Sequence, residues 1–173
     1  KPILFKKDNH RVLISSTDGL GDAFLRLSVV HALAEKHGVE NVCVLTRDAS
    51  APLYKTLGIQ TIRYTDKHRV SPWQRLGLVR YINNLDLRRV YVMDFALTEN
   101  IVDLFHIPEK IGFSNASRLD PADRFTLTIA HPFYVGEALH NFCAAMGINP
   151  PLMDNTRFFP MPIPISKNAK KLK

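Results

Sequence analysis

The chain has 173 residues, 46% of them hydrophobic and 23% charged, which is typical of a globular protein with one main domain. Its longest apolar runs are far shorter than the roughly 20 residues of a membrane-spanning helix. The net charge is +7, but Lys167, Lys170, Lys171 and Lys173 carry four of these charges, and the remaining +3 is too dispersed to indicate nucleic-acid binding. A solvated basic surface would explain the remaining positive charge. Affinity for an acidic small molecule, a phosphorylated lipid or an anionic membrane would explain it as well.

Apolar runs and helical patterns alternate along the chain. A first apolar run follows Arg11 and ends in a turn with two glycines, and further strands are predicted at residues 41–46, 60–64, 89–94, 110–113 and 125–130. Helices are predicted at residues 23–36, 51–57, 73–84, 98–105 and 134–146. Strands that alternate with helices at this spacing pair in parallel, with helices on both faces of the sheet. The predicted fold is a Rossmann-like α/β domain, whose ligand crevice is expected beyond the carboxyl ends of the strands.

The composition changes near residue 150, because five prolines stand between residues 150 and 164. Such a segment favours an extended linker, after which Ser166 would suit the cap of a further helix. We therefore divide the chain into a Rossmann-like domain at residues 1–149 and, at residues 150–173, a linker with the start of a second domain. The chain is then expected to be the first half of a larger protein, and a processed protein with a solvated basic tail is the alternative.

Cysteines and histidines are not arranged as a metal site. Cys43 and Cys143 lie in separate apolar segments and are expected to be buried free thiols, while the seven histidines are scattered. No metal site is predicted. The first residues lack the apolar core and cleavage site of a signal peptide, so the predicted location is cytoplasmic.

The turn after the first strand carries Gly19 and Gly21, which invites comparison with the dinucleotide-binding fingerprint. The third glycine of that fingerprint is replaced by Phe24, whose bulk is expected to block close approach of helix and strand. The second strand leads into Arg47 and Asp48 rather than a lone acid, although an arginine there would suit a phosphorylated ribose. An NAD(P)- or nucleotide-binding module of an oxidoreductase is therefore weakly supported, and it stays as the alternative function.

Asp22 stands where the first helix is predicted to begin. The N-terminus of a helix favours an ionised carboxylate, and a general base must be ionised in order to accept a proton. Aspartate is also common in first helical turns for capping alone, and its position by itself favours that structural explanation.

Several segments resemble glycosyltransferase family 9, the heptosyltransferases of the lipopolysaccharide inner core. Residues 14–22, together with Leu25, Val30 and Leu33, look like the family's N-terminal motif. Residues 90–94 resemble its strand that ends in aspartate, residues 110–113 its Ile-Gly-Phe motif, and residues 135–148 the helix before its interdomain segment. The order and spacing of these segments over residues 11–148 make the match specific.

The resemblance implies the GT-B architecture, in which two Rossmann-like domains face each other across a cleft and this chain supplies the acceptor side. Asp22 would be the base of an inverting transfer of a sugar, heptose from ADP-heptose, to a lipopolysaccharide-core or related glycan acceptor. The nucleotide sugar would be held by the second domain, no cofactor or divalent metal is implied, and peripheral contact with the inner face of the cytoplasmic membrane is expected. The implied acceptor contacts are Thr17, Asp18, Gly19, Gly21 and Asp94.

Departures from the family pattern bear on the identity of the acceptor. Ser16 stands in place of a basic residue, Ser28 in place of a proline, and Phe95-Ala96 in place of a glutamine-glycine pair. Asp18 matches a variant of the loop and would support acceptor binding or loop geometry.

Two further features have both a functional and a structural interpretation. Lys67 and Arg69, in a predicted basic loop, are candidates for contacts with acceptor phosphates, although solvated loops are commoner. Trp73 would suit stacking on a sugar, but a tryptophan that starts an amphipathic helix is more often partly buried. A non-catalytic binding domain is a further alternative function.

Overall fold

The computed structural model describes residues 11–94, 101–114, 125–130 and 135–149. Strands and helices alternate over most of these residues. The elements are β1 (Val12–Ser16), α1 (Leu20–His37), the 3-10 helix η1 (Val39–Asn41), β2 (Val42–Arg47), α2 (Ala51–Thr56), β3 (Gln60–Tyr64), α3 (Asp66–Val70), α4 (Pro72–Asn83), β4 (Arg89–Val92), the 3-10 helix η3 (Ile101–Leu104), β5 (Glu109–Ser114), β6 (Leu127–Ala130) and α5 (Val135–Ala145).

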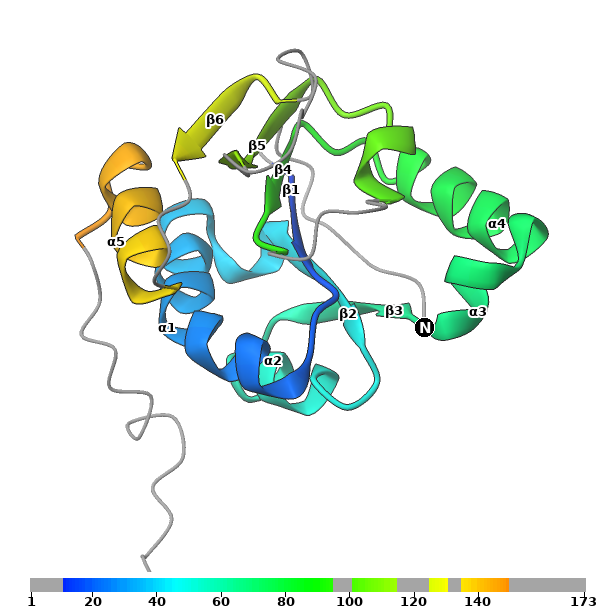
Figure 1. The fold of residues 1–173 in the computed structure, drawn as a ribbon, viewed down its shortest axis with the longest axis horizontal. Helices are drawn as coiled ribbons and strands as arrows, with labels where there is room; N and C mark the ends of the chain where they lie inside the picture. The colour runs from blue at the N-terminus through cyan, green and yellow to red at the C-terminus, as the bar shows by residue number, and fades with distance from the viewer. Residues whose placement is uncertain (1–10, 95–100, 115–124, 131–134, 150–173) are drawn as a thin grey trace, which may run out of the picture.

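Six parallel strands form one sheet in the order β3-β2-β1-β4-β5-β6 (Figure 1). β1 lies between β2 and β4, with Val12 opposite Val42 on one side and Arg89 on the other. The chain runs outward from β1 to β3 and then returns to place β4 beside β1, so the strand order reverses between β1 and β4. In open α/β sheets this reversal marks the place where ligands bind. The predicted Rossmann-like fold is confirmed.

An apolar layer covers each face of the sheet. Ile14 and Val44 belong to the layer beneath α1, α2 and α5, whereas Leu13 and Leu45 pack with residues of α4 and η3 on the opposite face. Because helices cover both faces, every residue of β1 is buried, as is typical of parallel sheets. Cys43 and Cys143 are buried free thiols in these layers, which confirms their prediction.

Helix α1 begins at Leu20, earlier than the predicted start at residue 23, and Gly19 is its N-cap residue. Asp22 therefore lies inside the first turn, where a negative charge interacts favourably with the helix dipole. Gly38, with a φ angle of 83°, ends the helix in a conformation that favours glycine.

Gly112 explains the Ile-Gly-Phe motif through packing. A Cβ atom at this position would lie 2.7 Å from the Cζ atom of Phe125, closer than side-chain atoms approach each other. The glycine therefore lets the ring of Phe125 lie against β5. This motif has a structural cause and gives no evidence about ligands.

Two local predictions are wrong. Residues 67–69 do not form a loop but belong to α3, which begins with a capping box between Thr65 and His68. Histidine is not the usual partner in a capping box, so the sequence gives no clear helix start here. Trp73 was expected to be partly buried, but 82% of its surface is exposed.

Other predictions fall partly outside the described residues. The helix predicted at residues 98–105 is represented by η3, whereas residues 95–100, with Phe95-Ala96, are not described. Residues 150–173, the predicted linker and second-domain start, also lie outside the described part of the chain. Within the described part, no helix is long and apolar enough to cross a bilayer.

Candidate functional site

Asp94 anchors the turn after β1 at the point where the strand order reverses. It follows β4, and the backbone N–H of Met93 donates to the Ser15 carbonyl at 3.0 Å, which carries the β1–β4 pairing to the end of the strands. The Ser15 hydroxyl and the Thr17 backbone N–H donate short hydrogen bonds to the Asp94 carboxylate, and the Thr17 hydroxyl donates a third at 3.2 Å. Asp94 is only 2% exposed, so its contacts give it a role in holding the loop.

Burial raises the pKa of Asp94, and the nearby Asp18 carboxylate raises it further. The Arg26 guanidinium and the hydrogen bonds from Ser15 and Thr17 oppose this rise, because they favour the charged form. The loop conformation and the charge of Asp94 therefore depend on each other.

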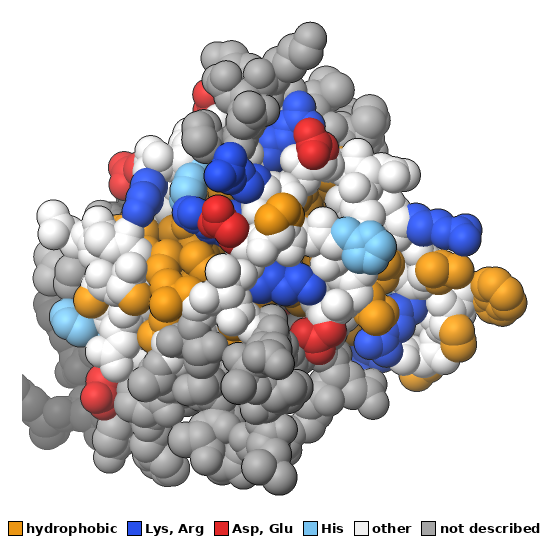
Figure 2. All heavy atoms as spheres, turned by 90° about the horizontal axis from the view of Figure 1, so that it is seen from above, with side chains coloured by type: hydrophobic (Ala, Val, Ile, Leu, Met, Phe, Trp, Pro, Cys, Tyr) orange, Lys and Arg blue, Asp and Glu red, His pale blue; other side chains and the backbone are white. Residues whose placement is uncertain are grey.

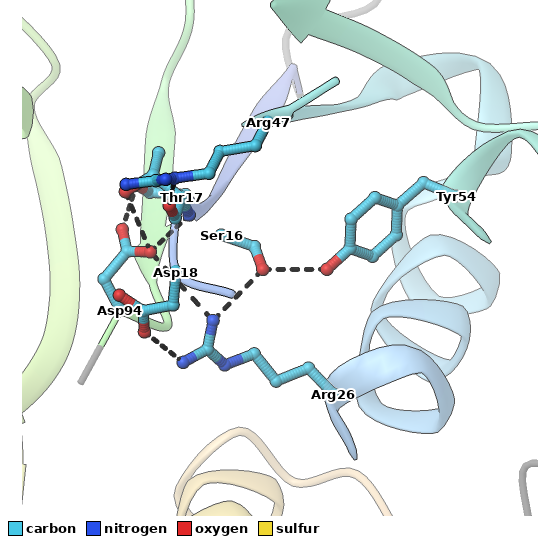
Figure 3. A network of polar contacts seen from close by, with 8 residues as sticks. Ser16, Thr17, Asp18, Arg26, Arg47, Tyr54 and Asp94 are labelled. Atoms are coloured by element: carbon cyan, nitrogen blue, oxygen red, sulfur yellow. Dashed lines mark hydrogen bonds and ion pairs between the residues drawn. The ribbon is translucent and has the colours of Figure 1, made fainter. Parts of the chain in front are cut away.

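Arg26 connects helix α1 to both aspartates (Figure 3). Its side chain is fully buried, and its Nη2 atom donates to Asp18 Oδ2 at 2.5 Å. Its Nη1 atom donates to the Ser16 hydroxyl at 3.1 Å and lies 4.0 Å from Asp94 Oδ1. A buried guanidinium is tolerated only with such partners, so this cluster fixes the turn relative to the helix.

Tyr54 and Arg47 extend the cluster toward β2 and α2. The Tyr54 and Ser16 hydroxyls lie 2.7 Å apart, and burial raises the pKa of Tyr54 to about 12, so the phenol stays neutral at pH 7. Arg47 Nε donates to the Thr17 carbonyl at 2.7 Å. The Nε atom of Arg47, a residue that would suit a phosphorylated ribose, thus supports the loop.

Asp22 lies at the rim of this cluster, partly exposed in the first turn of α1. Among the described residues, none forms a hydrogen bond or an ion pair with its carboxylate. Asp18 and Asp94 thus have partners, whereas Asp22 offers an open carboxylate at the mouth of the sheet. The geometry suits a group that accepts a proton from a bound molecule.

The two glycines of the turn are not required by the backbone. Neither Gly19 nor Gly21 has a positive φ angle. A Cβ atom on Gly21 would have no neighbour within 4 Å, and one on Gly19 would be at an ordinary 3.5 Å from Asp22 Oδ2. The surroundings of Gly21 are as open as those of Gly77 and Gly136, so packing does not require glycine there.

Lys67 and Arg69 lie on α3 and are exposed, outside the cluster around Arg26. Arg47 Nη1, 3.7 Å from Asp66 Oδ1, connects the cluster to this helix. Lys67 lines a surface pocket at the carboxyl ends of β2 and β3, whereas Arg69 does not. The lining residues are Asp48, Arg63, Thr65, Asp66, Lys67, His68 and Gln74.

Phe24 does not act as predicted. Its side chain is 40% exposed on the outer face of α1, so it does not separate the helix from the strand. Ala23, Arg26 and Leu27 are the fully buried residues of these turns. The size of Phe24 therefore does not argue against a dinucleotide at this turn.

Arg26 and Tyr54 were not predicted as site residues. Arg26 shares a helical face with Ala23, Leu27 and Val30, all of which are buried. A charged residue on an apolar face needs a buried partner, and this signal was available in the sequence. Within the described residues, no group of three or more His, Cys, Asp or Glu side chains could hold a metal ion.

No protein-family profile and no curated protein sequence matches the chain. Its structure is similar to that of E. coli heptosyltransferase WaaC with ADP-2-deoxy-2-fluoro heptose, at 15% identity and a TM-score of 0.63, over 86% of this chain and 53% of that chain. It is also similar to the same enzyme with ADP, at 15% identity and a TM-score of 0.61, over 86% and 52% of the two chains. The chain therefore has the fold of these structures and spans about half of their length.

Proposed function

We propose that this chain is the acceptor-side domain of a family 9 glycosyltransferase with GT-B architecture. The observation that carries the proposal is the open carboxylate of Asp22, which lies at the start of α1 where the strand order reverses. The likeness of the fold to heptosyltransferase structures supports it, as does the ordered motif resemblance in the sequence.

In the proposed reaction, Asp22 accepts the proton of an acceptor sugar hydroxyl. The hydroxyl oxygen then forms a bond to the anomeric carbon of the donor, and the bond from that carbon to the nucleotide diphosphate breaks on the opposite side, with inversion. The cluster of Arg26 with Asp18 and Asp94 keeps the loop and Asp22 in place. Thr17, Gly19 and Gly21 are proposed to contact the acceptor, and Lys67 and Arg69 its phosphates.

The donor is proposed to be ADP-heptose, held by a second domain, and the acceptor a lipopolysaccharide-core or related glycan. Neither a cofactor nor a divalent metal takes part in this scheme, because basic side chains and a helix N-terminus of the second domain would stabilise the leaving diphosphate. The proposed location is the cytoplasm, at the inner face of the cytoplasmic membrane.

Charge at the turn disfavours the alternative of a dinucleotide-binding module. A pyrophosphate in the Rossmann position would meet the turn that carries Asp18, Asp22 and Asp94. The two cations of the turn cluster already have partners, since Arg26 pairs with Asp18 and Arg47 contacts the Thr17 carbonyl and Asp66. An anionic ligand would therefore be repelled there, whereas a sugar hydroxyl would not.

The test measures binding first and transfer second. Titration of the chain with an acceptor glycan, ADP-heptose and NADPH should show acceptor binding, and tight binding of NADPH would overturn the proposal. In the full two-domain protein, Asp22→Asn should lower kcat by about 100-fold or more with little change in acceptor affinity. A transfer rate that Asp22→Asn leaves unchanged would refute the role of Asp22 as the base. Glu35→Gln, on the exposed face of the same helix, is the matched control and should keep full activity.

A further inference from the structure

Helix α4 is apolar on two opposite faces. Leu78, Val79 and Ile82 are buried against the sheet, as expected of a helix that covers it. Trp73, Leu76 and Tyr81 are 82%, 39% and 38% exposed, and their spacing of three and five residues places them along the outer side. Surface helices normally carry polar residues on that side, so the outer face of α4 lacks a partner among the described residues.

The most exposed large apolar side chains of the described residues lie at the junction between α3 and α4. Val70 is 80% exposed and Trp73 is 82% exposed, the two largest values among the large apolar residues of the described chain. Side chains with so little contact to their own protein stand out from the surface and do not line a groove. Their apolar surface is therefore available to a partner outside the chain.

Positive charge surrounds these apolar side chains. Between residues 66 and 83 the sequence has four lysines and arginines and one acid, Asp66, whose carboxylate faces Arg47 at 3.7 Å. Lys67, Arg69 and Arg80 are all exposed. Figure 2 shows hydrophobic and basic side chains side by side at the end of the molecule where α3 and α4 lie.

We infer that the α3–α4 surface, formed by Val70, Trp73, Leu76 and Tyr81 with Lys67, Arg69 and Arg80, docks on an anionic lipid bilayer. Tryptophan and tyrosine favour the membrane interface, and helices that lie in that interface combine apolar side chains with lysine and arginine. Each basic residue near an anionic bilayer adds about fivefold to the affinity, so three of them complement the apolar contact.

The α3–α4 surface begins at the same end of the sheet as the proposed acceptor site. α3 follows β3, Asp94 follows β4, and α1 with Asp22 follows β1. All three therefore lie beyond the carboxyl ends of the parallel strands. If the proposed transfer reaction holds, a docked bilayer would bring lipid-linked acceptors to that end of the sheet. The docking itself requires neither donor nor acceptor, so it can be tested whether or not the proposed function is correct.

The experiment uses Trp73, which is the only tryptophan of the chain, as a local probe. Vesicles that contain phosphatidylglycerol should shift its emission to shorter wavelength, and lipids brominated in the acyl chain should quench it. Vesicles of phosphatidylcholine alone should produce a much smaller shift. Sedimentation with vesicles is not sufficient, because the four lysines between residues 167 and 173 would also attract anionic lipid.

Matched variants separate the two contributions. Val70→Ser should weaken the vesicle-induced emission shift about tenfold in apparent affinity, whereas Val39→Ser, also at an exposed valine, should leave it unchanged. Arg80→Gln should weaken it about fivefold, whereas Lys55→Gln on α2 should not. Circular dichroism confirms that each variant is folded.

Three results would overturn the inference. The first is an emission spectrum that phosphatidylglycerol vesicles do not change. The second is an equal response to phosphatidylcholine, which would remove the role of the basic residues. The third is an emission shift that depends on protein concentration without vesicles, which would assign the surface to a second copy of the chain.

Discussion

The Nη2 atom of Arg26 lies 2.5 Å from the Oδ2 atom of Asp18, and the Arg26 side chain has no exposed surface. Asp18 belongs to the turn after β1, and Arg26 to the second turn of α1. The ion pair therefore joins the two ends of the segment that contains Gly19, Gly21 and Asp22. Asp22 lies within this segment and is not itself part of the pair.

Replacing Arg26 with methionine should destabilise the protein by about 3–5 kcal/mol, because Asp18 and the buried Asp94 would lose their cation. Urea unfolding at pH 7 measures the change in the free energy of unfolding. Arg80→Met, at an exposed position on α4, is the control and should change stability by less than about 0.5 kcal/mol. A loss below about 1 kcal/mol for Arg26→Met would show that the cluster is not an energetic unit.

Features of the fold with local causes can be predicted from the sequence, whereas those that depend on tertiary packing cannot. Apolar runs such as residues 41–46 predict buried strands, and the parallel topology then places Thr17 and Asp94 at the same edge. The partners of Arg26 could not be predicted in the same way, because they depend on the rotation of α1 against β1. Trp73 was mispredicted because helical periodicity assumes a single apolar face, whereas α4 has two.

The buried phenol of Tyr54 should lower the free energy of unfolding at alkaline pH. Its pKa is raised by burial from an ordinary value near 10 to about 12 in the folded state. The folded state therefore disfavours the phenolate, so stability is complete below pH 10 and falls as the pH rises toward 12, by up to about 2–3 kcal/mol.

Tyr54→Phe should be less stable than the native protein by about 1 kcal/mol at pH 8, because the hydrogen bond to Ser16 is lost. This difference should shrink and then reverse as the pH approaches 11.5, since phenylalanine does not ionise. Urea unfolding between pH 8 and 11.5 measures the free energy of unfolding of both proteins. Tyr81→Phe is the control, because Tyr81 is 38% exposed, and its difference from the native protein should not vary with pH. A Tyr54→Phe difference that does not vary with pH would contradict the buried, neutral phenol.

Gly112→Ala should destabilise the fold by about 1–3 kcal/mol, because its Cβ atom would lie 2.7 Å from the Phe125 ring. Thermal or urea unfolding measures the loss. Gly77→Ala is the matched control, since a Cβ atom in that part of α4 has no neighbour within 4 Å, and it should stabilise the helix by up to about 1 kcal/mol. Combining Gly112→Ala with Phe125→Leu should recover part of the loss, and strictly additive effects would exclude a clash between the two residues.

Gly21→Ala separates a structural role for the glycine turn from a role in binding. Gly21 lies in the first turn of α1, and an added Cβ atom would meet no atom within 4 Å, so the free energy of unfolding should stay equal or rise by up to about 1 kcal/mol. Gly136→Ala is the matched control, because Gly136 has the same open surroundings in the first turn of α5.

If a ligand approaches the backbone at Gly21, only Gly21→Ala should weaken acceptor binding. The expected loss is roughly tenfold in affinity, which corresponds to about 1.4 kcal/mol of binding free energy. Calorimetric titration of both variants with the acceptor glycan measures this difference. Equal affinities would remove Gly21 from the acceptor site and leave Asp22 as the residue of this turn that the proposed reaction requires.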